Sequence, residues 1–110
     1  MSQPPSESEF ERAADAELKR LIECVIACDD SLDPDLQAGV LSIAFEDGAK
    51  YVVNSHRAAR QIWMAAERNA WHFDLEPASS SWRTPAGDEL WSTLSRVLGA
   101  KLGRTIELAR

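Results

Sequence analysis

The chain has 110 residues, of which 45% are hydrophobic and 27% charged, and this length and composition favour one compact domain over residues 1–110 with its own core. A formal net charge of -6 is the wrong sign for a protein that neutralises nucleic-acid phosphates or anionic membranes. No apolar run approaches the roughly 20 residues of a membrane span, and the first residues do not resemble a signal peptide. We therefore expect a soluble, cytoplasmic protein that binds neither nucleic acid nor membranes.

The charge is unevenly divided along the chain. Residues 1–47 carry twelve acids and three bases, whereas residues 48–110 carry six acids and nine bases. Such a division is typical of a protein whose acidic part meets a cation or a basic surface. An acidic helix that only keeps the protein soluble explains the same charges equally well.

A first helix is predicted over residues 8–28. A capping box of Ser6 with Glu9, or of Ser8 with Glu11, marks its start, and we expect residues 1–7 to be flexible. Pro34 and the acids before it mark its end. Apolar residues recur at steps of three and four and form one stripe that needs a partner surface: Phe10, Ala14, Leu18, Leu21, Val25 and Cys28.

From Leu36 onward the apolar period becomes two, which predicts strands. A first strand through residues 40–45 leads into a loop at residues 46–48, with Gly48 in the left-handed conformation. The strand that follows this loop places Tyr51 and Val53 on the core face and Val52 and Asn54 on the opposite face. A later strand, residues 60–66, places Ile62 and Met64 on the core side and Trp63 on the opposite side. Short strands at residues 71–73 and 81–83 flank a turn-rich segment, residues 76–80. The strands predict an antiparallel meander of five or six.

A second helix is predicted after Asp88, which is a plausible N-cap, and it ends near residues 99–103. Its apolar stripe consists of Leu90, Trp91, Leu94, Val97 and Leu98. The tail, residues 105–110, is expected to pack back along the first helix. Helix, consecutive strands and helix in this order indicate an α+β fold, a two-layer sandwich with both helices on one face of a five- to six-stranded antiparallel sheet.

Several segments of the chain resemble the bacterial frataxins, the CyaY family, in order from about residue 8 to residue 108. They are residues 8–10 (Ser-Glu-Phe), 39–48 (Gly-Val-Leu-Ser-Ile-Ala-Phe-Glu-Asp-Gly), 51–54 (Tyr-Val-Val-Asn), 61–63 (Gln-Ile-Trp), 72–74 (His-Phe-Asp) and 90–91 (Leu-Trp). The resemblance implies a frataxin-like fold and weak iron binding at surface carboxylates. It also implies docking on the cysteine desulfurase and the scaffold protein of iron–sulfur cluster assembly, by a monomer that can oligomerise with iron.

The acids of the first half are the candidate iron ligands, because ferrous and ferric iron favour carboxylate oxygens and a shallow cluster of them binds weakly. The candidates are Glu11, Asp15, Glu23, Asp29, Asp30, Asp33 and Asp35. Alternatively, the later Asp residues only form turns and Asp15 pairs with Lys19. Ile26 and Ala27 stand where relatives tend to carry further acids, which lowers the expected capacity of the patch.

Cys24 and Cys28 are one helical turn apart and could share a metal or be oxidised together. Cys28 continues the apolar stripe, so core packing is the favoured interpretation of the pair. The histidines do not match a zinc module, because His56 is predicted in a loop and His72 in a strand.

Trp63 is predicted to lie exposed on the face of the sheet away from the helices, which is typical of an interface anchor. Asn54, Gln61 and His72 are expected to share that face with Trp63 and to bind partners. The matching Asn, Gln and Trp of the family serve partner binding. Residues 55–59 depart from the family's usual Gln and Pro, so the sequence leaves the conformation of that segment open.

These observations favour a non-enzymatic, iron-binding regulator or adaptor of iron–sulfur cluster assembly. A ferroxidase or iron-storing oligomer is the first alternative, although the sequence lacks the Glu-x-x-His motif of di-iron bundles. An acidic interaction module without a metal is the second.

Overall fold

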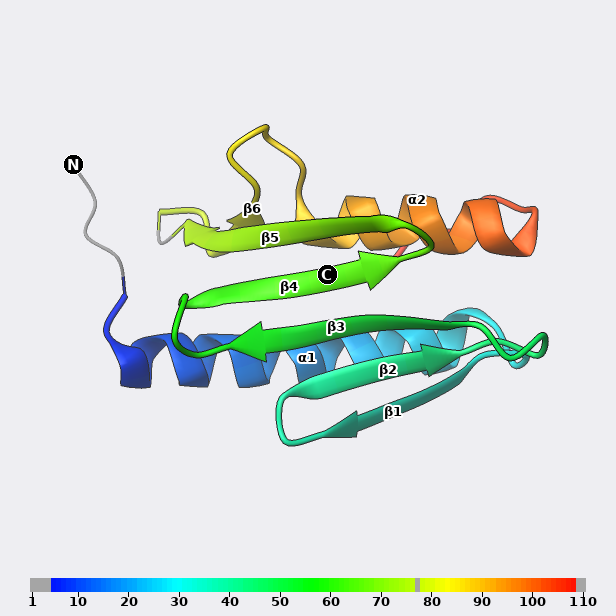
Figure 1. Cartoon of the computed structure of the whole chain (residues 1–110), viewed down its shortest axis with the longest axis horizontal. Helices are drawn as coiled ribbons and strands as arrows, with labels where there is room; N and C mark the ends of the chain where they lie inside the picture. Colours follow the sequence, from blue (N-terminus) through cyan, green and yellow to red (C-terminus); the bar gives the residue numbers. More distant parts are fainter. Residues whose placement is uncertain (1–4, 77, 109–110) are drawn as a thin grey trace.

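The computed structural model describes residues 5–76 and 78–108. In chain order the elements are α1 (Glu7–Cys28), β1 (Asp33–Gln37), β2 (Val40–Ala44), β3 (Lys50–His56), β4 (Gln61–Ala66), β5 (Asn69–Glu76), β6 (Ser81–Arg83) and α2 (Leu90–Leu102). The six strands form one antiparallel sheet in the order of the sequence. Figure 1 shows both helices behind this sheet. The predicted α+β sandwich is confirmed.

The first helix begins at a capping box, as predicted. The Ser6 hydroxyl accepts a hydrogen bond from the Glu9 amide at 3.2 Å, and the Glu9 carboxylate accepts one from the Ser6 amide. This box starts α1 at Glu7, one residue before the predicted start at residue 8. Residues 1–4 lie outside the described residues.

Strand β1 was not predicted as a separate strand. Its run of Asp33, Pro34 and Asp35 was interpreted as turn chemistry alone, but these residues pair with Ala44, Ile43 and Ser42 of β2. The strand turns into β2 at Ala38 and Gly39, whose φ angles are 50° and 78°. Pro34 is compatible with this strand because β1 is the edge of the sheet, where a missing N–H costs no ladder bond.

The loop after β2 has the predicted form. Gly48 has a φ of 90°, and the Phe45 amide donates to the Ala49 carbonyl at 2.9 Å. The predicted phase of β4 is also confirmed, since Ile62 and Met64 are 0% and 1% exposed. The side chain of Trp63 therefore points to the outer face of the sheet.

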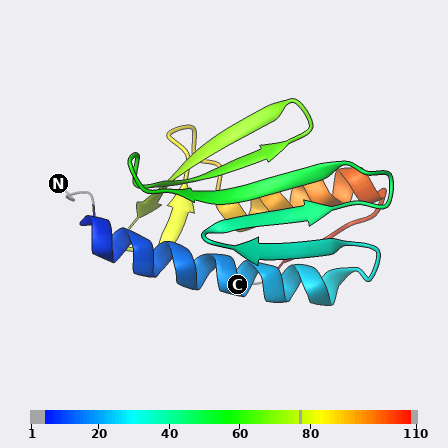
Figure 2. The ribbon, with the colours of Figure 1, turned by 60° about the horizontal axis from the view of Figure 1, so that its bottom comes forward.

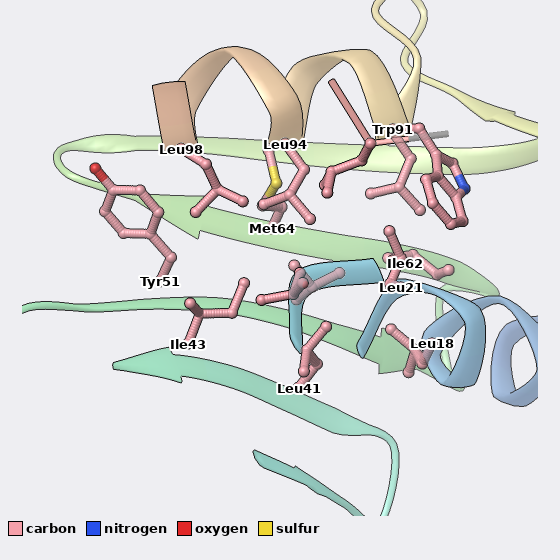
Figure 3. Close-up of a cluster of buried hydrophobic side chains, with 14 of the residues drawn as sticks. Leu18, Leu21, Leu41, Ile43, Tyr51, Ile62, Met64, Trp91, Leu94 and Leu98 are labelled. Atoms are coloured by element: carbon pink, nitrogen blue, oxygen red, sulfur yellow. The ribbon is translucent and has the colours of Figure 1, made fainter. Parts of the chain in front are cut away.

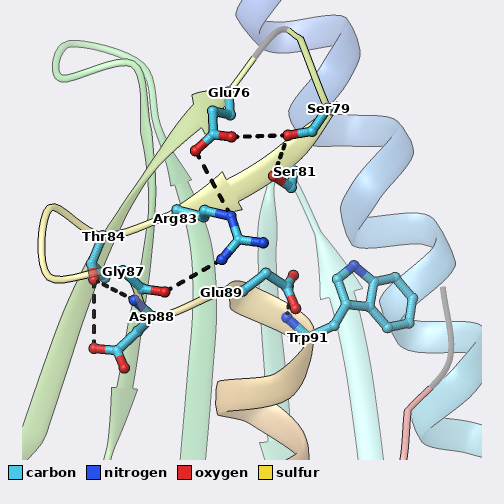
Figure 4. Close-up of polar contacts among 9 residues, drawn as sticks. All are labelled: Glu76, Ser79, Ser81, Arg83, Thr84, Gly87, Asp88, Glu89 and Trp91. Atoms are coloured by element: carbon cyan, nitrogen blue, oxygen red, sulfur yellow. Dashed lines mark hydrogen bonds and ion pairs between the residues drawn. The ribbon is translucent and has the colours of Figure 1, made fainter.

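The predicted N-cap of the second helix was one residue too early. Glu89 caps α2, and its carboxylate accepts hydrogen bonds from the Trp91 and Ser92 amides at 2.9 and 3.1 Å. Figure 4 shows the contact with Trp91. Asp88 belongs instead to the preceding turn, where its amide donates to the Thr84 hydroxyl. Glu89 forms a bridge with Arg83, which keeps it extended and delays the helix. The helix ends at Gly103, with a φ of 72°, within the predicted region.

The core lies between the sheet and both helices (Figure 3). Leu18 and Leu21 of α1 and Leu94 and Leu98 of α2 are at most 1% exposed. Cys24 and Cys28 pack against this core and are not joined in a disulfide, as predicted. Burial, together with the neighbouring negative charge of Asp29, raises the pKa of the Cys28 thiol.

Glu17 is a buried carboxylate that the sequence reasoning missed. It is 2% exposed and accepts hydrogen bonds from the indole N–H groups of Trp82 at 3.0 Å and of Trp91 at 2.8 Å. Its place seven residues after Phe10 and four before Leu21 puts it on the apolar stripe. A carboxylate in that stripe could therefore have signalled a buried acceptor for nearby tryptophans.

The C-terminal tail returns between the helices (Figure 2). Arg104 donates to the Cys28 carbonyl and to the Asp29 carboxylate at 2.8 and 2.7 Å, and Leu108 donates its amide to Ser95 of α2 at 2.9 Å. The contact with α1 thus comes from Arg104, just before the predicted tail, and the hydrogen bond of the tail itself is to α2. Residues 109–110 and Pro77 lie outside the described residues. Within residues 5–76 and 78–108, no helix is long and apolar enough to cross a membrane.

Candidate functional site

Three of the four predicted partner-binding residues lie side by side across the outer face of the sheet. Asn54 of β3 pairs with Trp63 of β4, and Trp63 pairs with His72 of β5. Gln61, the fourth, lies two residues before Trp63 on the same face. The structure therefore brings together the whole set that the alternation of the strands predicted.

The indole of Trp63 is sandwiched between two imidazoles. The ring of His56 lies 3.8 Å from the Trp63 ring and the ring of His72 lies 4.2 Å from it, centroid to centroid, each at an interplanar angle of 12°. We call His56, Trp63 and His72 the ring ladder. The sequence predicted an exposed tryptophan, but Trp63 is half-buried because its own neighbours cover both faces of the indole.

A chain of hydrogen bonds fixes the orientation of the ring ladder. The Trp63 Nε1–H donates to Gln61 Oε1 at 2.8 Å, and Gln61 Nε2 donates to Asp74 Oδ1 at 3.0 Å. Gln61 faces Asp74 in the register of β4 and β5. Because the indole N–H of Trp63 already has an acceptor in Gln61, the orientation of the indole on the outer face is fixed.

Two members of this surface were missed from the sequence. His56 was placed in a loop, but it is the last residue of β3 and pairs with Gln61. Asp74 was not considered, although it follows His72 by two residues on the same strand. Extending the alternation by one step, from Asn54 to His56 and from His72 to Asp74, would have found both.

The seven candidate metal ligands are spread over three places. Glu11, Asp15 and Glu23 lie along α1, Asp29 and Asp30 lie at its C-terminal end, and Asp33 and Asp35 lie on β1. On β1 the inward positions are taken by Pro34 and Leu36, which pair with buried Ile43 and Leu41 of β2, so Asp33 and Asp35 point to the outer face. In the part of the chain that the structure describes, no three His, Cys, Asp or Glu side chains converge on one metal position.

Two of these acids already have cationic partners. The carboxylate of Glu11 contacts the guanidinium of Arg57. Asp29 accepts hydrogen bonds from the Ser31 hydroxyl at 2.6 Å and from Arg104 at 2.7 Å. The Ser31 hydroxyl, followed by Arg104, lowers the pKa of Asp29 to about 2. Asp29 is thus a structural cap, whereas Asp15, Glu23, Asp30, Asp33 and Asp35 are exposed.

The sequence and the fold both match known proteins. The family model of the frataxin-like domain matches residues 3–104. The iron–sulfur cluster assembly protein CyaY of Thioalkalivibrio sulfidiphilus is 37% identical over 99 residues, which are 89% of this chain and 91% of that protein. The protein of the same name from Dechloromonas aromatica is 39% identical over 104 residues, 93% of this chain and 97% of its own.

Solved structures share the fold. The frataxin of Psychromonas ingrahamii superposes with a TM-score of 0.86 at 24% identity, over 96% of this chain and all of that one. Trimeric frataxin from Saccharomyces cerevisiae, complexed with ferrous iron, superposes with a TM-score of 0.64 at 23% identity, over 94% of this chain and 92% of that one. With the family model matched over nearly its whole length, the chain belongs to the frataxin-like family, alongside the bacterial CyaY proteins.

Proposed function

We propose that this protein is a non-enzymatic iron-binding adaptor or regulator of iron–sulfur cluster assembly, which docks on a cysteine desulfurase and its scaffold protein. The single observation that carries this proposal is the ring ladder on the outer face of the sheet. A tryptophan that is held in place, on a face that no helix covers, is the kind of rigid aromatic anchor that dominates protein interfaces. Relatives named iron–sulfur cluster assembly protein CyaY support the pathway in this proposal.

Iron is the cargo in this proposal, and the exposed acids supply the ligands that it prefers. We assign weak binding to the carboxylates that have no cationic partner among the described ion pairs: Asp15, Glu23, Asp30, Asp33 and Asp35. Carboxylate oxygens suit hard cations, and a spread of them without imidazole or thiolate holds iron loosely. Loose, rapidly exchanging iron is what delivery or sensing requires.

Titration with ferrous iron under anaerobic conditions tests the metal. Changing Asp30, Asp33 and Asp35 to Asn should weaken binding several-fold while the fold is retained. A matched control changes Glu46, Glu76 and Glu107 to Gln, because both triple variants bring the net charge from -6 to -3. Equal weakening in both variants would show that iron binding depends on net charge alone. The assignment of iron to Asp30, Asp33 and Asp35 would then be wrong.

Binding to the desulfurase–scaffold complex tests the docking surface. Trp63→Ala should weaken association by about 2 kcal/mol or more if Trp63 is a hot spot. Association through the acidic residues should also slow as ionic strength rises, since exposed charges are screened over about 8 Å at 0.15 M salt. Normal binding of Trp63→Ala would refute the docking role.

Oxygen consumption in the presence of ferrous iron separates the alternatives. Stoichiometric consumption that is coupled to assembly into larger particles would favour a ferroxidase or iron-storing oligomer. Partner binding without any iron titration would favour an acidic interaction module.

A further inference from the structure

Arg57 connects the turn beside the ring ladder to the first helix. The turn, residues 57–60, joins β3 to β4, and Arg57 directly follows His56. The Arg57 guanidinium contacts the Glu11 carboxylate and lies 3.6 Å from an oxygen of Glu7. Figure 1 shows this turn beside the start of α1. One side chain therefore ties a surface turn to two acids on the first two turns of the helix.

The position of the His56 ring depends on the conformation of the same turn. His56 Nδ1 accepts a hydrogen bond from the Ala59 amide at 3.3 Å, and the Arg60 amide donates to the Arg57 carbonyl at 3.1 Å. Arg60 has a φ of 51°, in the left-handed region that residues other than glycine rarely adopt. The turn thus holds the His56 ring through its own hydrogen bonds, and the contacts of Arg57 attach this turn to α1.

We propose that Arg57 is a positioning residue that holds His56 over Trp63 by ion pairing with Glu11 and Glu7. The stacking of His56 on Trp63 then depends on whether those two carboxylates are bound to Arg57. The consequence for docking rests on the proposed function, whereas the positioning role itself does not.

The ion pairs of Arg57 with Glu11 and Glu7 are suited to a switch because they break easily. The side chains of Arg57, Glu7 and Glu11 are 67%, 56% and 39% exposed, and ion pairs with this exposure are weak and screened by salt. The expected effect of breaking them is therefore a shift of about two- to fivefold in the ratio of stacked to unstacked His56.

His72 is the internal control. It stacks on the other face of Trp63, at 4.2 Å, from β5, which is not part of the turn. Loss of the Arg57 contact should release His56 and leave His72 in place. General unfolding would release both rings.

The test is the NMR chemical shift of the ring protons of both histidines, at one pH near 8 where free imidazoles are neutral. In Arg57→Gln and in Glu11→Gln, the His56 protons should move toward their unstacked positions, and those of His72 should not. Arg60→Gln, in the same turn, is the matched control and should move neither. Because Arg57→Gln already breaks the contact with Glu11, the double variant should add little to Arg57→Gln alone.

A salt titration of the unmodified protein gives a second measurement that needs no variant. Raising NaCl from 0.05 to 1 M should move His56 alone, and the same salt should have no further effect on Arg57→Gln. His56 shifts that stay constant in both variants and in salt would overturn the proposal. So would movement of both histidines together.

Docking on the desulfurase–scaffold complex is measured with the same variants. Arg57→Gln should change Kd by about two- to fivefold, whereas Arg60→Gln should not. If Trp63→Ala binds normally, the docking function fails, and the NMR result still decides the role of Arg57. If Trp63→Ala loses binding but His56 stays stacked in Arg57→Gln, only the positioning role fails.

Discussion

The two faces of the sheet use tryptophan in opposite ways. On the inner face, Trp82 and Trp91 are 1% and 4% exposed and both donate to the carboxylate of Glu17. On the outer face, Trp63 is half-buried and donates to the amide of Gln61. Each of these three indole N–H groups has an acceptor, and the two faces differ in which parts of the chain the acceptor joins.

The inner contacts join distant parts of the chain, whereas the outer contact is local. Glu17 is 65 residues from Trp82 and 74 from Trp91, and it links α1 to β6 and to α2. Gln61 is two residues from Trp63 on the same strand. Substitutions on the inner face should therefore lower the free energy of unfolding most, and those on the outer face should mainly change the surface.

The largest effect is expected at the core positions of β4. Ile62→Ala or Met64→Ala should lower the free energy of unfolding by about 2–5 kcal/mol, because each opens a cavity among fully buried neighbours. Chemical denaturation measures the loss, with Ala65→Ser on the outer side of the same strand as the control. That control should stay within about 0.5 kcal/mol of the unmodified protein. Similar losses at all three positions would mean that the two faces do not differ.

Glu17→Gln should lower the free energy of unfolding by about 1–3 kcal/mol. The two indoles donate to different oxygens of Glu17, and glutamine offers only one oxygen, so one buried donor loses its acceptor. Glu23→Gln, exposed on the same helix, is the matched control and should have little effect. A more stable Glu17→Gln protein would show instead that burying the charge costs more than its hydrogen bonds contribute.

Trp63→Ala should lower stability by about 1–2 kcal/mol, since it removes two ring stacks but opens no closed cavity. Thermal unfolding of Trp63→Ala measures this loss, and thermal unfolding of Ile62→Ala gives the loss at a core position for comparison. A loss as large as that of Ile62→Ala would make the ring ladder part of the structural core.

The smallest effect is expected at Asp29, the residue that caps the C-terminal end of α1. Its pKa of about 2, below the ordinary 3.8, means that the folded state favours the ionised carboxylate. The stability from this preference is present above pH 3.8 and is lost as the pH falls toward 2. The difference in Tm between the unmodified protein and Asp29→Asn should therefore shrink over that range. Arg104→Gln should show part of the same change, and a difference independent of pH would contradict the assignment.

The sequence predicted the layers of the fold because periodicity reports burial. Ile62, Trp63 and Met64 fell on the correct faces, and so did the stripe of α1 that begins at Phe10. The separate strand β1 was missed because Pro34 between two acids has the composition of a turn. Only its pairing with β2, a contact outside the segment, makes it a strand.

The candidate site was predicted in its members but not in its arrangement. Alternation placed Asn54, Trp63 and His72 on one face, but nothing local indicates that two imidazoles cover the indole. The partners of Glu11 and Asp29 lie 46 and 75 residues away, at Arg57 and Arg104, and such pairings follow from the tertiary fold alone. Acids that seemed equivalent in the sequence therefore differ in what they can bind.

The contacts of α1 also bear on the order in which the protein folds. The sheet is a meander in which every strand pairs with the next, so its hairpins have low contact order and can form as soon as each strand exists. The first helix packs mainly against β1 and β3, which follow it directly in the chain, and Arg57 pairs with its N-terminal acids. Its contacts with Trp82, Trp91 and Arg104 can close only later. During synthesis from the N-terminus, we expect α1 to dock once β3 has emerged, and the buried hydrogen bonds of Glu17 to form only when nearly the whole chain is available.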